Sequence, residues 1–232
     1  KFYIGELLDN YILKEAKLQN KILLSKPSQE QAEVYAGISV KGGYVMPPLR
    51  GLYQDVQVCD FKSLYPSIIV GWNIGIDALN EDLSKQGSEN MTIFLNDRQI
   101  EEVSYQEWTD FLNKEKTLLD PNNEHIQTAN NAYFKRSINS FIGDLVGKLL
   151  DNRAEYKKKL KVLTPDTSEY NNTYAAERVV KEMANSMFGI TCDKRSRYFN
   201  KYVAEGITLT GQYLNKLSSH ITTQVGLRTI YG

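Results

Sequence analysis

Two long helical patterns in the second half of the chain constrain its fold more than any other feature. Apolar residues recur at helical spacing over residues 138–163 and again over residues 169–188. The short stretch between them contains Pro165, which cannot continue a helix. We therefore predict two antiparallel helices joined by a turn, and a third helix over residues 200–222. The buried stripe of the second helix is expected to consist of Ala176, Val179, Val180, Met183 and Met187.

The first half of the chain combines one helical pattern with β-type patterns. Residues 2–20 are predicted to form an amphipathic helix. Residues 42–58 carry glycines, prolines and β-branched residues, which predict a hairpin. The hairpin would lead into a buried strand at residues 56–59, with Asp60 at its end. A further strand is predicted at residues 227–231, so the expected fold class is α+β.

Composition narrows the class of protein only a little. Lys and Arg together number 28, as do Asp and Glu, so net charge gives no indication of a nucleic-acid partner. Cys59 and Cys192 lie far apart and match no metal or redox spacing, which favours a reduced, intracellular protein. No apolar run reaches the length of a membrane span, so we expect a soluble protein with no membrane partner. Residues 80–131 predict an irregular or partly helical insertion, in which His125 is expected at the surface.

Three groups of residues carry possible chemistry. Asp60 directly precedes a turn into a helix, where a carboxylate can hold Mg²⁺ and the helix N-terminus favours the phosphates of a nucleoside triphosphate. Lys181, Asn185 and Phe188 share one helical face. Arg153 and Lys157 are four residues apart on the preceding helix. Each group also has a structural alternative: a turn residue at Asp60, a solvated face with a Glu177–Lys181 pair, and a basic helix end.

Residues 60–69 resemble motif A of the family B DNA polymerases, D-x-x-S-L-Y-P-S-I-I, and match it at every defined position. The resemblance implies that Asp60 is a catalytic residue and a ligand of two Mg²⁺ ions, with the Phe61 carbonyl as a further ligand. It implies that the backbone amides of Ser63 and Leu64 hold the triphosphate. Tyr65 would pack against the deoxyribose and exclude a 2′-hydroxyl.

Residues 181–189 resemble motif B of the same family, K-x-x-x-N-S-x-Y-G, except that Phe188 stands where the pattern has Tyr. By this resemblance Lys181 is a catalytic and nucleotide-binding residue, and Asn185 faces the nascent base pair. The helix that carries Arg153 and Lys157 is similar to the family's fingers helix, in which such a pair clamps the β and γ phosphates. After motif B, basic residues alternate with an aromatic residue in a pattern that suits DNA backbone contacts; these are Arg195, Arg197 and Tyr198.

The resemblance implies a partial polymerase palm with a two-helix fingers hairpin. Residues 1–40 would be a connecting helical segment that enters the palm. Residues 41–137 would be palm with motif A and the variable insertion, and residues 138–189 the fingers with motif B. Residues 190–232 would form a palm helix and the start of the strand that leads to motif C.

The implied activity is template-directed nucleotidyl transfer from a dNTP to a primer 3′-OH in DNA replication. Implied partners are primer–template DNA, the dNTP and, through other regions, a sliding clamp. Because the family's Asp-Thr-Asp of motif C does not occur in the sequence, we expect a fragment that lacks the second catalytic aspartate and is inactive alone. Its complement would be the C-terminal remainder of a split or intein-interrupted polymerase. The expected location is the cytoplasm or nucleoid, or the nucleus or a virus-infected cell. The alternative is a non-catalytic nucleotide- or DNA-binding module of a replication complex.

Overall fold

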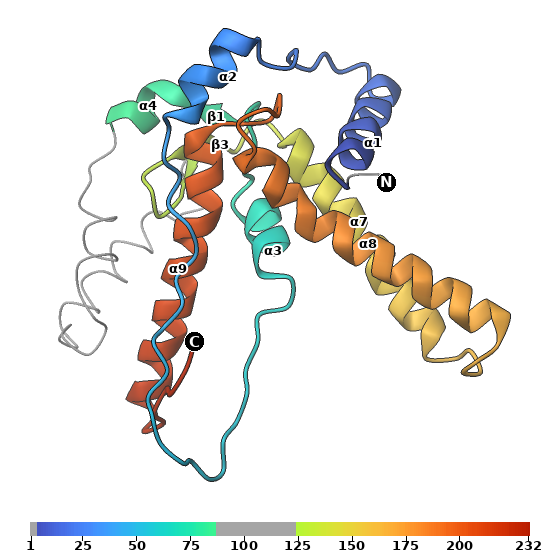
Figure 1. The fold of residues 1–232 in the computed structure, drawn as a ribbon, viewed down its shortest axis with the longest axis vertical. Helices are drawn as coiled ribbons and strands as arrows, with labels where there is room; N and C mark the ends of the chain where they lie inside the picture. The colour runs from blue at the N-terminus through green and yellow to red at the C-terminus, as the bar shows by residue number, and fades with distance from the viewer. Residues whose placement is uncertain (1–3, 87–123) are drawn as a thin grey trace.

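The fold is helix-rich α+β with one small antiparallel sheet (Figure 1). The structure is a computed structural model and describes residues 4–86 and 124–232. The elements follow in the order α1 (Ile4–Leu18), α2 (Gln29–Ala36), α3 (Leu64–Gly71), β1 (Leu79–Asn80), α4 (Glu81–Gln86), β2 (His125–Gln127), β3 (Tyr133–Lys135), α7 (Phe141–Leu160), α8 (Ser168–Cys192) and α9 (Lys201–Gln224). The sheet has the order β1-β3-β2, with Leu79 opposite Phe134 and Ile126 opposite the same residue.

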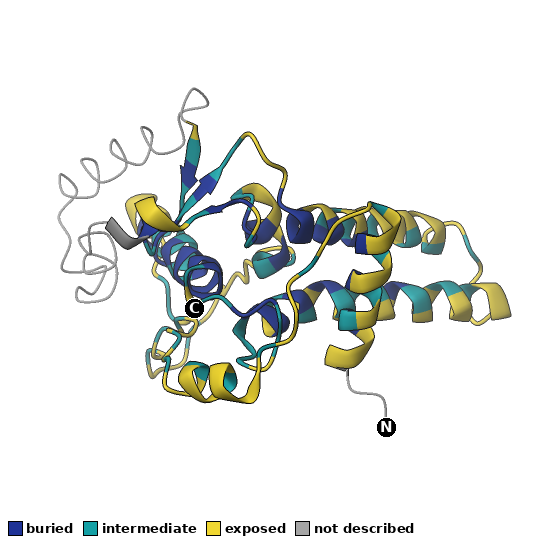
Figure 2. Ribbon diagram, turned by 90° about the horizontal axis from the view of Figure 1, so that it is seen from above, coloured by how far each residue is buried: buried dark blue, intermediate teal, exposed yellow. Residues whose placement is uncertain are grey.

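Helices α7 and α8 pack side by side and project from the rest of the molecule as an arm (Figure 1). Ser140 caps α7 by accepting from Gly143 N at 3.0 Å, and Thr167 caps α8 by accepting from Tyr170 N at 3.2 Å. Burial is concentrated where the arm meets the body, and the far ends of both helices are exposed (Figure 2). The two predicted helices are therefore present. The prediction that Val179 is buried is wrong, since that side chain lies on the outer face of α8 and is 53% exposed.

The core lies where α1, α3, the sheet, α9 and the proximal parts of α7 and α8 meet. Its largest fully buried side chains include Phe134, Leu8, Ile12, Ile68, Ile69, Leu145, Met187 and Ile207. Helix α1 confirms the helix predicted near the N-terminus. No helix within residues 4–86 and 124–232 combines the length and the apolar character that a membrane crossing requires. Cys59 and Cys192 are both free thiols.

The predicted strands at residues 56–59 and 227–231 do not form. Val58 is 89% exposed, and Asp60 lies on an exposed coil rather than at the end of a buried strand. Two bonds, from Met46 N to Gly232 O and from Leu49 N to Ile230 O, instead hold residues 46–49 beside residues 230–232. A pair of strands is marginal without a third strand or a packed face, and the described residues supply neither here.

Helix α9 holds the extended segment of residues 41–43 through side chains instead of a β-ladder. Glu205 Oε1 accepts from Lys41 N at 3.1 Å, and Thr208 Oγ1 donates to Lys41 O at 2.7 Å. One turn further on, Gln212 Nε2 donates to Gly42 O at 2.7 Å. These contacts fix the register of the segment against the helix.

Asn73 connects the end of α3 to the start of α7. Its Nδ2 donates to Lys135 O at 2.8 Å and to Ile138 O at 2.7 Å, while its Oδ1 accepts from Ser140 N at 2.8 Å. The residue has a φ of +53°, a conformation that asparagine tolerates better than most side chains. One amide therefore connects the end of α3 to the residues that lead into α7.

His125 lies on β2 and is half-buried, and its Nε2 is 3.1 Å from Asn80 Nδ2. The insertion predicted over residues 80–131 thus ends in ordered sheet, and the expectation that His125 is a surface residue holds only in part. The portion of that insertion between residues 87 and 123 lies outside the described residues.

Replacing Gly75 with alanine should destabilise the protein by about 1–3 kcal/mol. A Cβ at Gly75 would lie 2.1 Å from Ser140 Oγ, the atom that caps α7. Chemical denaturation measures the effect. Gly147→Ala is the matched control, because a Cβ there meets nothing within 4 Å and alanine favours a helix interior by about 1 kcal/mol. Equal stability of the two variants would contradict the packing at Gly75.

Candidate functional site

The N-terminus of α3 presents unpaired backbone donors directly after Asp60 and Phe61. Ser63 is in the left-handed conformation, with φ 52° and ψ 55°, and makes no side-chain cap. A left-handed residue other than glycine costs roughly 1 kcal/mol, and such strain is common where a chain binds ligands. The first N–H groups of the helix, including that of Leu64, have no intrahelical carbonyl to donate to. An anion is the ligand that this geometry favours.

Arg153 joins three helices at this point. Its Nη1 donates to Ser63 Oγ at 2.8 Å, and its Nε donates to Glu177 Oε1 of α8 at 2.8 Å. Both side chains of the ion pair are largely buried, at 14% exposed for Arg153 and 8% for Glu177. The alternative in which Glu177 pairs with Lys181 on a solvated face is therefore wrong. Glu177 faces α7 because the two helices pack along that side.

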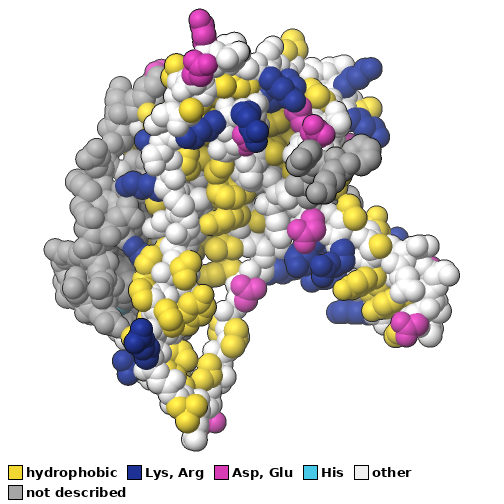
Figure 3. All heavy atoms as spheres, in the orientation of Figure 1, with side chains coloured by type: hydrophobic (Ala, Val, Ile, Leu, Met, Phe, Trp, Pro, Cys, Tyr) yellow, Lys and Arg dark blue, Asp and Glu magenta, His cyan; other side chains and the backbone are white. Residues whose placement is uncertain are grey.

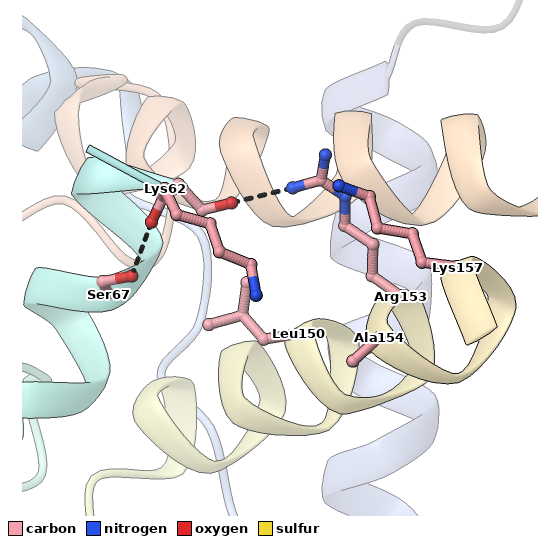
Figure 4. A pocket seen from close by; sticks show the side chains of 7 residues that line it. Lys62, Ser67, Leu150, Arg153, Ala154 and Lys157 are labelled. Carbon is pink, nitrogen blue, oxygen red and sulfur yellow. Dashed lines mark hydrogen bonds between the residues drawn. The ribbon is translucent and has the colours of Figure 1, made fainter. Parts of the chain in front are cut away.

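A cavity of about 130 Å³ lies between α3 and α7. Lys62, Arg153 and Lys157 bring three positive charges to it, and the hydroxyls of Ser63 and Ser67 line it as well. Figure 4 shows Lys62 approaching from the α3 side, while Arg153 and Lys157 extend from α7. Figure 3 shows Lys and Arg side chains gathered in the hollow between the arm and the rest of the molecule. Sequence reasoning missed Lys62, which occupies a variable position of the motif.

A second, more open cavity of about 240 Å³ brings Tyr65 and Asn185 together, with Leu64 and Pro66. The ring of Tyr65 packs against Phe188 with centroids 4.7 Å apart and an interplanar angle of 53°. Burial, with a smaller contribution from nearby Cys192, raises the pKa of Tyr65, so its hydroxyl stays neutral. Helices α3 and α8 therefore form one side of this cavity, where the ring of Tyr65 and the amide of Asn185 lie.

Two glycines leave room for the ring of Tyr65. A Cβ at Gly211 of α9 would lie 3.0 Å from Tyr65 Cε1, and a Cβ at Gly43 would lie 2.8 Å from its hydroxyl. The backbone at both glycines therefore approaches the ring closely, and together with Phe188 it limits where the ring can move.

Lys181 lies half-buried on α8, one turn after Glu177 and one turn before Asn185. It lines neither cavity in the part of the chain that the structure describes. Asp60 and Phe61 are both exposed, and Asp60 stands four residues before Leu64, the first residue of α3.

The described residues supply only some of the ligands that a metal ion at Asp60 would need. The Asp60 carboxylate and the Phe61 carbonyl are oxygen donors of the kind that Mg²⁺ prefers, and both precede the anion-favouring N-terminus of α3. Within residues 4–86 and 124–232, no cluster of three or more His, Cys, Asp or Glu side chains could hold a metal. An ion at Asp60 would therefore need oxygen ligands other than the side chains of these described residues.

The residues predicted to contact DNA have mainly structural partners. Arg197 donates from Nε to Asp9 Oδ1 at 3.0 Å and from Nη1 to Leu24 O at 2.8 Å. Tyr198 is 6% exposed, and its hydroxyl donates to the same Asp9 oxygen at 3.3 Å. Both residues thereby tie α1 to the turn between α8 and α9. Arg195 is exposed and bonds to Asp193, so it is the one of the three that lies at the surface.

The sequence of the chain matches a known protein family. The family model described as DNA polymerase family B matches residues 6–230. The chain therefore belongs to DNA polymerase family B. Proteins of this family generally use divalent metal ions.

The relatives in this family are much longer than this chain. The DNA polymerase of Thermococcus gorgonarius is 29% identical over 232 residues, and that of Pyrococcus glycovorans is 28% identical over 228 residues. Each match covers 98% of this chain and 24% of the relative, so the chain spans about a quarter of their length. The structure of the family B DNA polymerase from Pyrobaculum calidifontis has the same fold over 100% of this chain and 25% of its own, with a TM-score of 0.68 and 22% identity.

The network around Asp9 should make stability depend on pH. Burial raises the pKa of Asp9, but the hydrogen bonds and charges of Arg197 and Lys26 together outweigh it and leave the pKa below 3.8. A lowered pKa in the folded state stabilises the protein above the unfolded value, and this contribution is lost as pH falls through the folded pKa. The stability difference between wild type and Asp9→Asn should therefore be full at about pH 6 and shrink towards about pH 3.

Denaturation of wild type and Asp9→Asn at several pH values measures this difference. In an Arg197→Ala background, the stability difference that Asp9→Asn causes should be smaller, because Asp9 has then lost its principal partner. A difference that stays constant over the whole range would contradict the assigned network.

Proposed function

We propose that this chain forms the nucleotide-binding part of a DNA-directed DNA polymerase, which copies a template by transferring a nucleotide from a dNTP to a primer 3′-OH. The observation that carries the proposal is the bond between Arg153 and Ser63, which places a guanidinium at the N-terminus of α3 just after Asp60. The position of these groups suits a triphosphate, since Lys62 and Lys157 add charge to the same cavity.

The triphosphate would lie along the N-terminus of α3. Arg153 can bind two phosphate oxygens at once through its planar fork, and Lys157 acts as a mobile point charge. The amides of Ser63 and Leu64 would donate to phosphate oxygens, because α3 leaves them without a carbonyl partner. We assign Lys181 to the same ligand, with its flexible side chain extending from α8.

Asp60 and the Phe61 carbonyl would hold Mg²⁺ at the end of the triphosphate nearest the primer. Bound Mg²⁺ would supply positive charge that lowers the pKa of the 3′-hydroxyl and stabilises the leaving pyrophosphate. In the transfer the 3′-oxygen bonds to the α-phosphorus and the bond to the β-phosphate breaks. The contribution of this chain is to bind the phosphates in line with that attack.

Sugar and base would face the second cavity. The fixed ring of Tyr65 would exclude a 2′-hydroxyl, because Gly43, Gly211 and Phe188 leave it no space to withdraw. Asn185 lines the same cavity and would face the nascent base pair.

The arm of α7 and α8 would be the fingers, and the surrounding elements part of the palm. Its exposed far end fits an element that moves towards a bound nucleotide. DNA contacts after motif B would rest on Arg195, since Arg197 and Tyr198 are bound to Asp9.

Primer extension by the polymerase that carries this chain tests the proposal. Asp60→Asn should lower the rate by roughly 10³-fold or more, because it removes a metal ligand from the reacting phosphate. Asp55→Asn is the matched control, an exposed aspartate of the same extended segment whose φ of 56° asparagine accepts. Nucleotide binding without any primer extension by the wild type would favour a non-catalytic binding module instead.

Tyr65→Ala should weaken discrimination against ribonucleotides by about 10- to 100-fold, because it removes the ring from the proposed sugar wall. The ratio of kcat/KM for a dNTP to that for the matching rNTP measures discrimination. Tyr65→Phe retains the ring and should retain the ratio. An unchanged ratio in Tyr65→Ala would rule out this role.

A further inference from the structure

We propose that Glu177 is a positioning residue for the triphosphate: it holds one edge of the Arg153 guanidinium so that the other edge faces the N-terminus of α3. This inference rests on the proposed function and deepens it. Glu177 lines neither cavity, so it would act through Arg153 and not by contact with the nucleotide.

Two N–H donors of Arg153 bond within the protein, and its other N–H donors stay available for a ligand. Glu177 accepts from Nε at 2.8 Å, and Ser63 accepts from Nη1 at 2.8 Å. An arginine has five N–H donors, so three remain after these two bonds. The terminal edge of the guanidinium can therefore bind phosphate oxygens while Nε stays on Glu177.

Burial shows why a fixed hydrogen-bond acceptor beside Arg153 serves this purpose. Glu177 is 8% exposed and Arg153 14%, so neither charge has much access to water. The pair removes most of the rotational freedom of the long arginine before a ligand arrives, and a ligand then loses less entropy when it binds. A buried guanidinium without this partner would have to reorient or be desolvated alone.

The bonds of Arg153 to Glu177 and Ser63 also link the three helices on which the site depends. Glu177 lies on α8, Arg153 on α7 and Ser63 at the start of α3. Lys181 and Asn185 follow Glu177 along α8 by one and two turns. The bond thus fixes the phosphate end of the site on the same helix that carries the residue proposed to face the base pair.

Steady-state kinetics of primer extension by the polymerase that carries this chain test the inference. Glu177→Ala should raise KM for the dNTP about tenfold and change kcat by less than about threefold, as expected when a ligand-positioning group is lost. Glu177→Gln should stay within about threefold of wild type, because its amide oxygen still accepts from Nε. Glu177→Asp keeps the charge but is one methylene too short, and should behave like Glu177→Ala.

A double-mutant cycle with Arg153→Lys separates positioning from a general structural effect. Lysine has no Nε edge, so Glu177→Ala should raise KM no further in that background. Glu182→Ala, an exposed glutamate on the same helix, is the matched control and should leave KM unchanged. Thermal unfolding of each variant shows whether it folds.

Three results would overturn the inference. They are an unchanged or lower KM in Glu177→Ala, an undiminished effect of that change beside Arg153→Lys, and a Gln variant as impaired as the Ala variant. Should Glu177→Ala fail to fold, the Asp and Gln variants decide, since only the Asp variant should raise KM. A wild type that binds dNTP but extends no primer would overturn the proposed function itself, and this inference with it.

Discussion

The amide of Asn73 is the constraint on which the site depends. Its three side-chain bonds hold the end of α3 against the chain that leads into α7, including Ser140 at the cap. The end of α3 that we propose to face the nucleotide has Ser63 as its N-cap residue, and Arg153 lies about three turns along α7. This junction, together with the packing of α3 against α7, keeps the two side chains close to each other in this structure. The bond from Arg153 to Ser63 can therefore form without help from a ligand.

Helical spacing predicted the two helices of the arm because it is a local property of the sequence. The resemblance to the polymerase family implied that Arg153 and Ser63 share one site, and in the structure a hydrogen bond joins them. The partner of Glu177 could not be found this way. Four residues separate it from Lys181 and 24 from Arg153, and only the packing of α7 on α8 decides between the two cations.

The misses share a physical cause. A β-type pattern shows how residues 56–59 would lie in a sheet, but not whether a partner strand is present. The same alternation of basic and aromatic residues occurs whether Arg197 contacts DNA or, as here, bonds to Asp9, so the sequence pattern cannot distinguish the two. Helix α2 was missed although its signal is in the sequence: Ser28 and Gln31 form a capping box at its start.

The side chains of α9 that hold residues 41–43 set the register of this segment beside Tyr65, the residue proposed to exclude a 2′-hydroxyl. The segment would place Tyr44 where Gly43 now stands if it slipped by one residue, and only glycine leaves space for the hydroxyl of Tyr65. Glu205, Thr208 and Gln212 prevent such a slip by bonding to particular backbone atoms. Sugar selection would therefore be encoded in an alignment between two parts of the chain more than 160 residues apart, and a shift in that alignment could alter it without changing any residue that touches the nucleotide.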